Sequence, residues 1–247
     1  MKVLLINLDR STERLRQIKQ QLEQLNISFE RVAAIDANTL SDQALDFVKT
    51  PNFEYPYPLT KGEIACFLSH RKCWELIVSS NEDWTLVLED NALISPRIVE
   101  YIANSEWIPK ECELIQLTYT DLPTYTNKVL EVPHNTLMRT EYSSPFGTSA
   151  YLISKKVASI ALEHSKVLQS PVDNFLFSSW SSFSKSISFW RLKTPVVKRN
   201  NVNSTITDRN KATKTWSLYR CTPKRLLTKI HFKLHRRFLQ KEKQTWI

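Results

Sequence analysis

Glycine is almost absent from this chain, because only Gly62 and Gly147 occur among its 247 residues. A dinucleotide-binding fingerprint requires three glycines at fixed spacing, and a phosphate-binding P-loop requires two. Neither motif is therefore present, and collagen-like or glycine-rich linker sequences are excluded as well. Since glycine alone takes a positive φ without steric cost, we expect Gly147 to mark such a conformation or a close approach of the backbone to a ligand.

The composition is that of a globular protein with a sizeable core. Hydrophobic residues make up 42% and charged residues 24% of the chain, which argues against wholesale disorder. The four cysteines contain no C-x-x-C pair, which favours a reducing compartment. No apolar run reaches the length of a signal-peptide core or a membrane span, so we expect a cytoplasmic protein.

The positive charge is concentrated at the C-terminal end. The net charge is +9, and residues 207–247 alone carry +10, which leaves −1 for residues 1–206. The sequence therefore predicts a nearly neutral body over residues 1–206 and a basic tail over residues 207–247.

The tail has the pattern of a basic amphipathic helix, in which basic residues separate apolar ones at spacings of three and four. The apolar positions are Leu226, Leu227, Ile230, Leu234 and Phe238. Each Lys or Arg near an anionic membrane contributes about 1 kcal/mol, so the pattern favours docking at such a surface. Packing of the apolar stripe on the body is the main alternative. Nucleic-acid binding is a third, and we expect no nucleic-acid partner because the tail contains no recognised motif.

Apolar runs predict strands that alternate with helices along the body. The expected strands span residues 3–6, 29–35, 84–88, 113–117, 149–153 and 187–192. Ser11 is placed to cap the first helix, Thr60 and Glu63 have the spacing of a capping box, and Pro96 is expected at the first position of a third helix. This order predicts a single α/β domain with a mainly parallel, twisted sheet flanked by helices.

Polar clusters follow three of these strands: residues 7–10, Asp36, and residues 89–91. Ligands of parallel sheets bind beyond the carboxyl ends of the strands, so we expect these clusters to converge there. Acidic side chains at a strand end can hold a divalent cation that clamps a diphosphate, whereas an ordinary turn with solvated acids is the alternative.

Several segments resemble motifs of glycosyltransferase family 25, and they occur in the family's order along residues 3–206. The bacterial members of this family build the outer sugars of lipooligosaccharide. The matching segments are residues 5–10 (LINLDR) with Arg14, 34–36 (AID), 59–70 (LTKGEIACFLSH), 86–92 (LVLEDNA), 147–151 (GTSAY) and 171–173 (PVD).

The resemblance implies a GT-A-like domain over residues 1–206, which transfers a sugar, typically galactose, from a UDP-sugar with inversion at the anomeric carbon. The family motif usually reads Glu-Asp-Asp, but this chain has Glu89, Asp90 and Asn91. An amide oxygen can still ligate Mn²⁺ or Mg²⁺, yet it brings no charge, so a weaker metal site is expected. We expect Asp90 and Asn91 to be the metal ligands, and Glu89 to help place the metal and the diphosphate.

The other site residues are assigned by the needs of the reaction and by the resemblance. We expect the nucleotide to be bound by Asn7, Arg10, Arg14 and Asp36, and the donor site to include Lys61, Gly62, Glu63, His70, Gly147 and Thr148. Arg14 could instead be a surface residue, Glu63 a capping residue, and His70 a packing residue.

Inversion requires a general base that takes the proton of the acceptor hydroxyl. Asp173 is the candidate, and its alternative role is a helix N-cap.

Together, these observations predict a metal-assisted, inverting transferase that moves galactose from a UDP-sugar to lipooligosaccharide. We expect it to act at the cytoplasmic face of the inner membrane, where the tail would hold it on the anionic surface. Two alternatives remain: a non-catalytic protein that binds nucleotide-sugar or glycan on the same scaffold, suggested by Asn91, and a nucleic-acid-binding protein with a basic tail.

Overall fold

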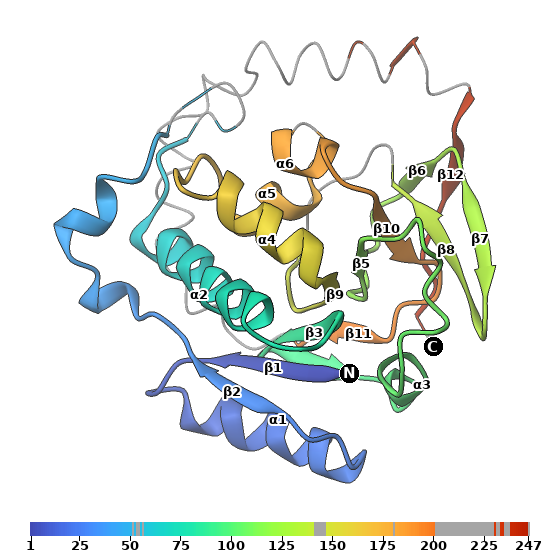
Figure 1. Cartoon of the computed structure of the whole chain (residues 1–247), viewed down its shortest axis with the longest axis horizontal. Helices are drawn as coiled ribbons and strands as arrows, with labels where there is room; N and C mark the ends of the chain where they lie inside the picture. Colours follow the sequence, from blue (N-terminus) through green and yellow to red (C-terminus); the bar gives the residue numbers. More distant parts are fainter. Residues whose placement is uncertain are drawn as a thin grey trace.

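An eight-stranded sheet forms the centre of the molecule (Figure 1). The computed structural model describes residues 1–50, 52, 55, 57–140, 147–179, 181–200, 230, 233–234 and 238–246. In spatial order the strands are β2 (Glu30–Ala33), β1 (Lys2–Asn7), β3 (Trp84–Glu89), β9 (Ala150–Ser154), β5 (Leu114–Gln116), β10 (Phe189–Leu192), β8 (Asn135–Arg139) and β7 (Val129–Val132).

Six of the eight strands run in one direction, and β9 and β8 run in the other. The mainly parallel sheet expected from the sequence is therefore confirmed. The reversal of β9 was not predicted. It lies between β3 and β5 and pairs antiparallel with both, so a reversed strand occupies the middle of the sheet.

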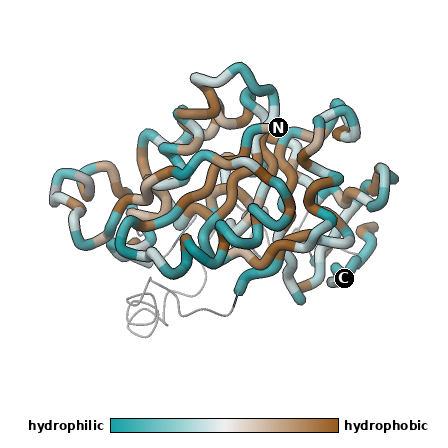
Figure 2. The backbone as a smooth tube through the Cα atoms, turned by 90° about the horizontal axis from the view of Figure 1, so that it is seen from below, coloured by the Kyte–Doolittle hydropathy of each residue, from teal (hydrophilic) through white to brown (hydrophobic). Residues whose placement is uncertain are grey.

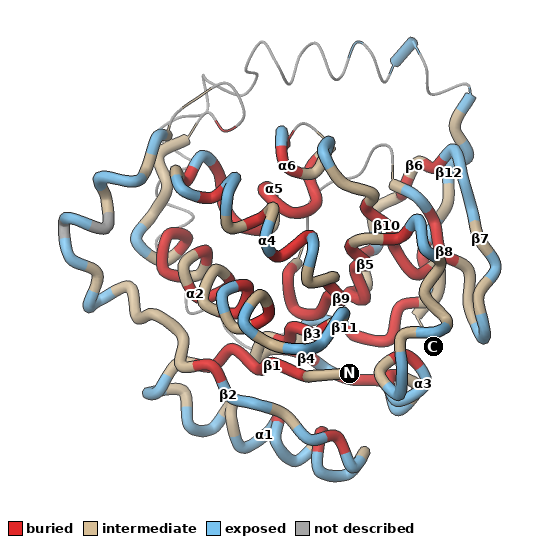
Figure 3. Tube along the Cα trace, viewed as in Figure 1, coloured by how far each residue is buried: buried red, intermediate tan, exposed pale blue. Residues whose placement is uncertain are grey.

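Helices cover both faces of the sheet, as expected. On one face lie α1 (Thr12–Gln24) and α3 (Ile98–Ile102); on the other lie α2 (Lys61–Val78), α4 (Lys155–His164), α5 (Val172–Phe177) and α6 (Ser182–Lys185). The core accordingly forms two hydrophobic layers, with the sheet between them. Buried residues concentrate along the strands of the sheet and in the helices beside them (Figure 3). Hydrophobic segments gather in the interior of the molecule and hydrophilic ones on its outside (Figure 2). Because both faces are covered, β1 is buried from Val3 onward without alternation.

The predicted starts of α1 and α2 match the structure in position, but only α2 has the predicted side-chain cap. Thr60 and Glu63 form the expected capping box: Glu63 N donates to Thr60 Oγ1 at 3.2 Å, and Thr60 N donates to Glu63 Oε2 at 3.1 Å. Ser11 precedes α1 but makes no capping hydrogen bond with its side chain.

The prediction for Pro96 is wrong, since α3 begins at Ile98. The chain is still paired in this region, because Ser95 N donates to Val196 O and extends the ladder between β4 (Ala92–Ile94) and β11 (Val197–Arg199). A turn then precedes the helix.

The C-terminal end returns to the body. Strand β12 (Gln240–Glu242) pairs with β6 (Thr124–Thr126), and the buried side chain of Gln244 bonds to Thr120 N and Leu192 O, both at 2.8 Å.

The predicted tail helix and the predicted boundary at residue 207 lie mostly outside the described residues. Of the apolar stripe, Ile230, Leu234 and Phe238 are described, and they are 46%, 63% and 70% exposed. Among the helices that the structure describes, none has both the length and the hydropathy needed to cross a bilayer.

Candidate active site

A cavity of about 230 Å³ opens where β1 and β3 end, bounded by the starts of α1, α2 and α5. It brings together every predicted site residue except Lys61 and Asp36. The predicted residues that line it are Asn7, Arg10, Arg14, Gly62, Glu63, His70, Glu89, Asp90, Asn91, Gly147, Thr148 and Asp173. Residues of two of the three expected clusters, 7–10 and 89–91, therefore converge in the lining, whereas Asp36 does not take part in it.

Asp90 is held at the base of the cavity by two neighbours. Asn7 Nδ2 donates to its Oδ2 at 2.8 Å, and Arg14 Nη1 lies 3.3 Å from its Oδ1. Arg31 Nε donates to Asn7 Oδ1 at 3.0 Å, which orients the Asn7 amide. Burial raises the pKa of Asp90, and the bonds to Asn7 and Arg14 oppose this increase without cancelling it. Only 15% of the Arg14 side chain is exposed, so the interpretation of Arg14 as a surface residue is wrong.

Glu89 accepts hydrogen bonds on both of its carboxylate oxygens. Asn91 Nδ2 donates to Oε2 at 2.9 Å, while the Thr148 hydroxyl donates to Oε1 and His70 Nε2 lies 3.3 Å from that same oxygen. Burial alone would raise the pKa of Glu89, but the interactions with His70, Thr148 and Asn91 together lower it to about 2. These neighbours therefore favour the ionised form of Glu89 in the wall of the cavity.

His70 is fully buried, and both of its ring nitrogens have neighbours within hydrogen-bonding distance. Its Nδ1 lies 2.9 Å from the hydroxyl of Tyr151, which also accepts a bond from Trp74 Nε1 at 3.1 Å. A chain of contacts thus runs from the core through Tyr151 and His70 to Glu89. His70 both packs in the core and reaches the cavity.

Asn91 offers an oxygen suited to a hard cation. Its Nδ2 donates to a carboxylate, which fixes the orientation of the amide, and its buried Oδ1 has no hydrogen-bond partner among the described residues. A carboxylate can accept more bonds than the two that Asp90 receives from Asn7 and Arg14. Asp90 and Asn91 therefore fit an oxygen-ligated Mn²⁺ or Mg²⁺.

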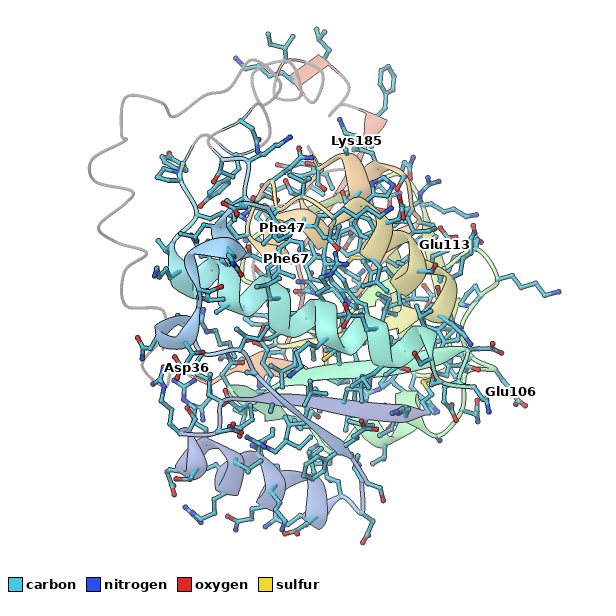
Figure 4. All side chains as sticks on the ribbon, turned by 60° about the vertical axis from the view of Figure 1, so that its left-hand side comes forward. Asp36, Phe47, Phe67, Glu106, Glu113 and Lys185 are labelled. Atoms are coloured by element: carbon cyan, nitrogen blue, oxygen red, sulfur yellow. The ribbon has the colours of Figure 1, made fainter. Side chains whose placement is uncertain are left out.

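Asp36 and Lys61 lie beside the cavity, outside its lining. Asp36 is on the loop after β2, next to the start of α1 (Figure 4), and Arg10 Nε donates to its Oδ2 at 2.6 Å. This bond is the main reason that the pKa of Asp36 is lowered. The geometry shows Asp36 orienting Arg10, which does line the cavity. Lys61 is exposed at the first position of α2.

Gly147 has a φ of +82°, which matches the expectation of a left-handed conformation. A Cβ at this position would lie 3.3 Å from Thr118 Cγ2, which is tighter than most contacts of that kind. The turn at Gly147 directs Thr148 toward Glu89. The role of Gly147 is thus conformational.

Asp173 reaches the cavity from the first turn of α5. The N-cap of that helix is Pro171, so the interpretation of Asp173 as the N-cap is wrong. Asp173 Oδ1 accepts a bond from Asn174 N at 2.9 Å.

Arg199 and Cys66 also line the cavity, although sequence reasoning did not select them. Arg199 ends β11, where it pairs with Ala92, and Asn200 N donates to Asn91 O at 2.7 Å. More than 100 residues separate Arg199 from Asn91, so only the strand pairing reveals that they are neighbours. For Cys66, its place one helical turn before His70 was the available signal.

Comparison with known proteins places this arrangement in a family. A family model described as glycosyltransferase family 25 (LPS biosynthesis protein) matches residues 1–176. A glycosyltransferase 25 family member of Aedes aegypti is 33% identical over 186 residues, which cover 70% of this chain and 30% of that protein. Human procollagen galactosyltransferase 2 is 29% identical over 187 residues, with coverage of 70% and 29%. The chain thus spans about 30% of the length of these relatives.

Among solved structures, a glycosyltransferase involved in the glycosylation of the major capsid of PBCV-1 aligns with 88% of this chain and 98% of its own, at a TM-score of 0.47 and 11% identity. That likeness is too low to carry an argument. The family model covers well over half of the chain, and its matched segment contains the strand ends and the motifs that build the cavity. The chain belongs to glycosyltransferase family 25.

Proposed function

We propose that this protein transfers galactose from a UDP-sugar to a lipooligosaccharide acceptor, with inversion at the anomeric carbon. The observation that carries the proposal is the cavity itself, where Arg10, Arg14 and Arg199 meet Asp90 and Asn91 at the strand ends. The family supports sugar transfer, and the relatives named as galactosyltransferases support galactose as the sugar.

Negative charge develops on the diphosphate as UDP leaves, and fixed positive groups stabilise it. Arginine suits this task because its planar guanidinium binds phosphate oxygens in pairs. Arg14 is held by Asp90, Arg10 by Asp36, and Arg199 by the strand pairing beside Asn91. Asp90 and Asn91 would hold Mn²⁺ or Mg²⁺, which would supply further positive charge at the diphosphate when bound.

The acceptor hydroxyl must lose its proton on the side of the sugar opposite to the leaving group. Asp173 is our candidate for the base. It enters the cavity from α5, whereas Asp90 and Asn91 follow β3. This placement on a separate element is what supports the assignment.

Calorimetric titration with UDP, with and without Mn²⁺, tests the nucleotide site and its metal. We expect UDP to bind, Mn²⁺ to strengthen that binding, and Asn91→Asp to increase the effect of Mn²⁺. Asn104→Asp, an exposed change outside the cavity, is the matched control. Absence of UDP binding would overturn the proposal. UDP binding of equal affinity with and without Mn²⁺ would overturn only the proposed metal site.

Hydrolysis of UDP-galactose separates an enzyme from a protein that only binds. We expect slow hydrolysis by the native chain and faster, Mn²⁺-dependent hydrolysis by Asn91→Asp. If both bind UDP-galactose and neither hydrolyses it or transfers the sugar, the non-catalytic alternative is correct.

We also propose that the basic tail holds the protein on the anionic cytoplasmic face of the inner membrane. The +10 charge of residues 207–247 and the exposed side chains of Ile230, Leu234 and Phe238 support this proposal. Truncation is a poor test, because β12 and Gln244 pack on the body.

Replacement of Ile230, Leu234 and Phe238 by serine should instead weaken co-sedimentation with phosphatidylglycerol vesicles and leave UDP binding intact. Phe47→Ser, which changes another exposed aromatic residue, is the control. If the triple variant binds these vesicles as the native chain does, the tail is not the membrane anchor.

A further inference from the structure

Three side chains with different donor atoms meet in the wall of the cavity. Cys66 and His70 are four residues apart on α2 and therefore share one face of the helix, and Glu89 ends β3 opposite them. One ligand atom from each, a sulfur, a nitrogen and an oxygen, lies within 4.8 Å of the other two. All three residues line the cavity.

We propose that Cys66, His70 and Glu89 form a binding site for a soft divalent cation, with Zn²⁺ as its natural type. Sulfur and imidazole nitrogen favour Zn²⁺ and Co²⁺ over Mg²⁺ and Mn²⁺. The site is chemically distinct from the pair formed by Asp90 and Asn91, which offers oxygen only. Three protein ligands leave a fourth tetrahedral position for water or another ligand.

The distances agree with one shared ion. Two ligands on one tetrahedral Zn²⁺ are about 3.4 Å apart for nitrogen and oxygen and about 3.6 Å apart when one is sulfur, given the usual bond lengths. His70 Nε2 and Glu89 Oε1 are already 3.3 Å apart. The sulfur of Cys66 lies within 4.8 Å of the other two ligand atoms, so it has to approach them by about 1.2 Å at most.

The surroundings of the ligands hold two of them in place. The hydroxyl of Tyr151 lies 2.9 Å from His70 Nδ1, and the Tyr151 ring stacks on the imidazole. These contacts leave Nε2 of His70 directed at Glu89. Thr148 donates to the same Glu89 oxygen that His70 contacts, and Asn91 donates to the other oxygen. Partners of this kind, which orient the ligands of a metal, are typical of zinc sites.

Binding would replace the contact between His70 and Glu89 with bonds from both groups to the ion. The Cys66 thiol would lose its proton to solvent and coordinate as the thiolate. His70 would coordinate through the lone pair of Nε2. The proton that Nε2 directs at Glu89 would therefore move, by exchange with solvent, to Nδ1, where it faces the Tyr151 oxygen. No oxidation or reduction is involved.

Titration with Co²⁺ tests the site directly, since a thiolate ligand gives a charge-transfer absorption band and tetrahedral Co²⁺ gives visible bands. We expect the native chain to bind one Co²⁺ with both signals and Zn²⁺ to displace it. Cys66→Ser should lose the charge-transfer band and at least tenfold in affinity, whereas Cys112→Ser, which changes a buried cysteine outside the cavity, should retain both. Absence of the charge-transfer band in the native chain, or its persistence in Cys66→Ser, would overturn the proposal.

A second measurement needs no variant. Alkylation of Cys66 by iodoacetamide, followed by mass spectrometry, should slow at least tenfold with Zn²⁺ and stay unchanged with Mg²⁺. Equal rates with and without Zn²⁺ would reject the site. Both experiments are performed without UDP, so their outcome is independent of the transferase proposal.

Discussion

Glu89 and Asp90 are adjacent carboxylates whose pKa values shift in opposite directions. Burial acts to raise both pKa values. Glu89 has three hydrogen-bonding neighbours and its pKa falls to about 2, whereas the bonds that Asp90 makes to Asn7 and Arg14 only reduce the increase. The partners of each side chain therefore decide the direction of its pKa shift. The ionised form of Glu89 is favoured, whereas burial makes the ionised form of Asp90 less favourable.

This difference predicts how stability depends on pH. The ordinary pKa of 4.5 for Glu89 lies above its folded value of about 2, so its contribution is complete above pH 4.5 and disappears as the pH falls toward 2. The shift corresponds to a free energy on the order of 3 kcal/mol. Denaturant unfolding should show Glu89→Gln less stable than the native chain at neutral pH, with a gap that narrows from about pH 5 to about pH 3.

Glu106→Gln, an exposed change, should show a gap that does not vary over that range. A constant gap for Glu89→Gln would contradict the lowered pKa.

Arg199 provides the second prediction. If it contacts the diphosphate, Arg199→Gln removes a charge-assisted bond, and the Kd for UDP should rise about tenfold or more. Lys198→Gln is the matched control, because Lys198 is adjacent on β11, lies over the ring of Tyr119 and does not line the cavity. Calorimetry with UDP measures both. Equal affinity for Arg199→Gln and the native chain would show that Arg199 is not a diphosphate ligand.

Some site residues could be recognised from the sequence because they follow strands directly. Asn7 and Asp90 belong to this class, and the hydrogen bond between them follows from the pairing of β1 with β3. Arg199 could not be found in this way, since its place depends on an antiparallel pairing across more than 100 residues. Asp36 was selected for its position after a strand, but it bonds to Arg10 and is not part of the lining of the cavity.

The two longest N-terminal helices differ in how they begin. Thr60 makes the side-chain bond of a capping box at the start of α2, while Ser11 makes none at the start of α1. Thr60→Ala should therefore destabilise the protein by about 1 kcal/mol. Ser11→Ala should change the free energy of unfolding by less than about 0.5 kcal/mol. Chemical denaturation of the two variants measures the contrast, and equal losses would contradict it.

The six strands expected from the sequence are all present, because their apolar runs reflect the faces that they bury. Six further described strands were not expected, and each is at most five residues long: β4, β6, β7, β8, β11 and β12. The direction of β9 could not be predicted in this way. When both faces of a sheet are covered, a parallel strand and an antiparallel strand are both continuous runs of apolar residues. The apolar run of β9 therefore does not indicate in which direction the strand lies. Similarly, Pro96 suits a helix start, but the pairing of Ser95 with Val196 delays the helix.

The last described residues pack beside β10, on the part of the sheet away from β2 and β1 in the strand order. Gln244 is buried and bonds to the backbone of Thr120 and Leu192, so Gln244→Ala leaves a donor and an acceptor without their partner. We expect a loss of roughly 2 kcal/mol in the free energy of unfolding. Lys243→Ala, at the exposed neighbouring position, should cost far less. If both variants unfold alike, the C-terminal end does not support the body.

The central position of β9 also determines how late during synthesis the middle of the sheet can be completed. Both neighbours of β9 precede it, and about 65 residues lie between the end of β3 and the end of β9. At typical rates of translation, that interval lasts on the order of 3 to 13 seconds. During this time we expect the edge of β3 that later pairs with β9 to be unpaired in the nascent chain. An unpaired strand edge can associate with strands of other chains. Chaperones that bind exposed strands are therefore expected to associate with this protein during its synthesis rather than after its release.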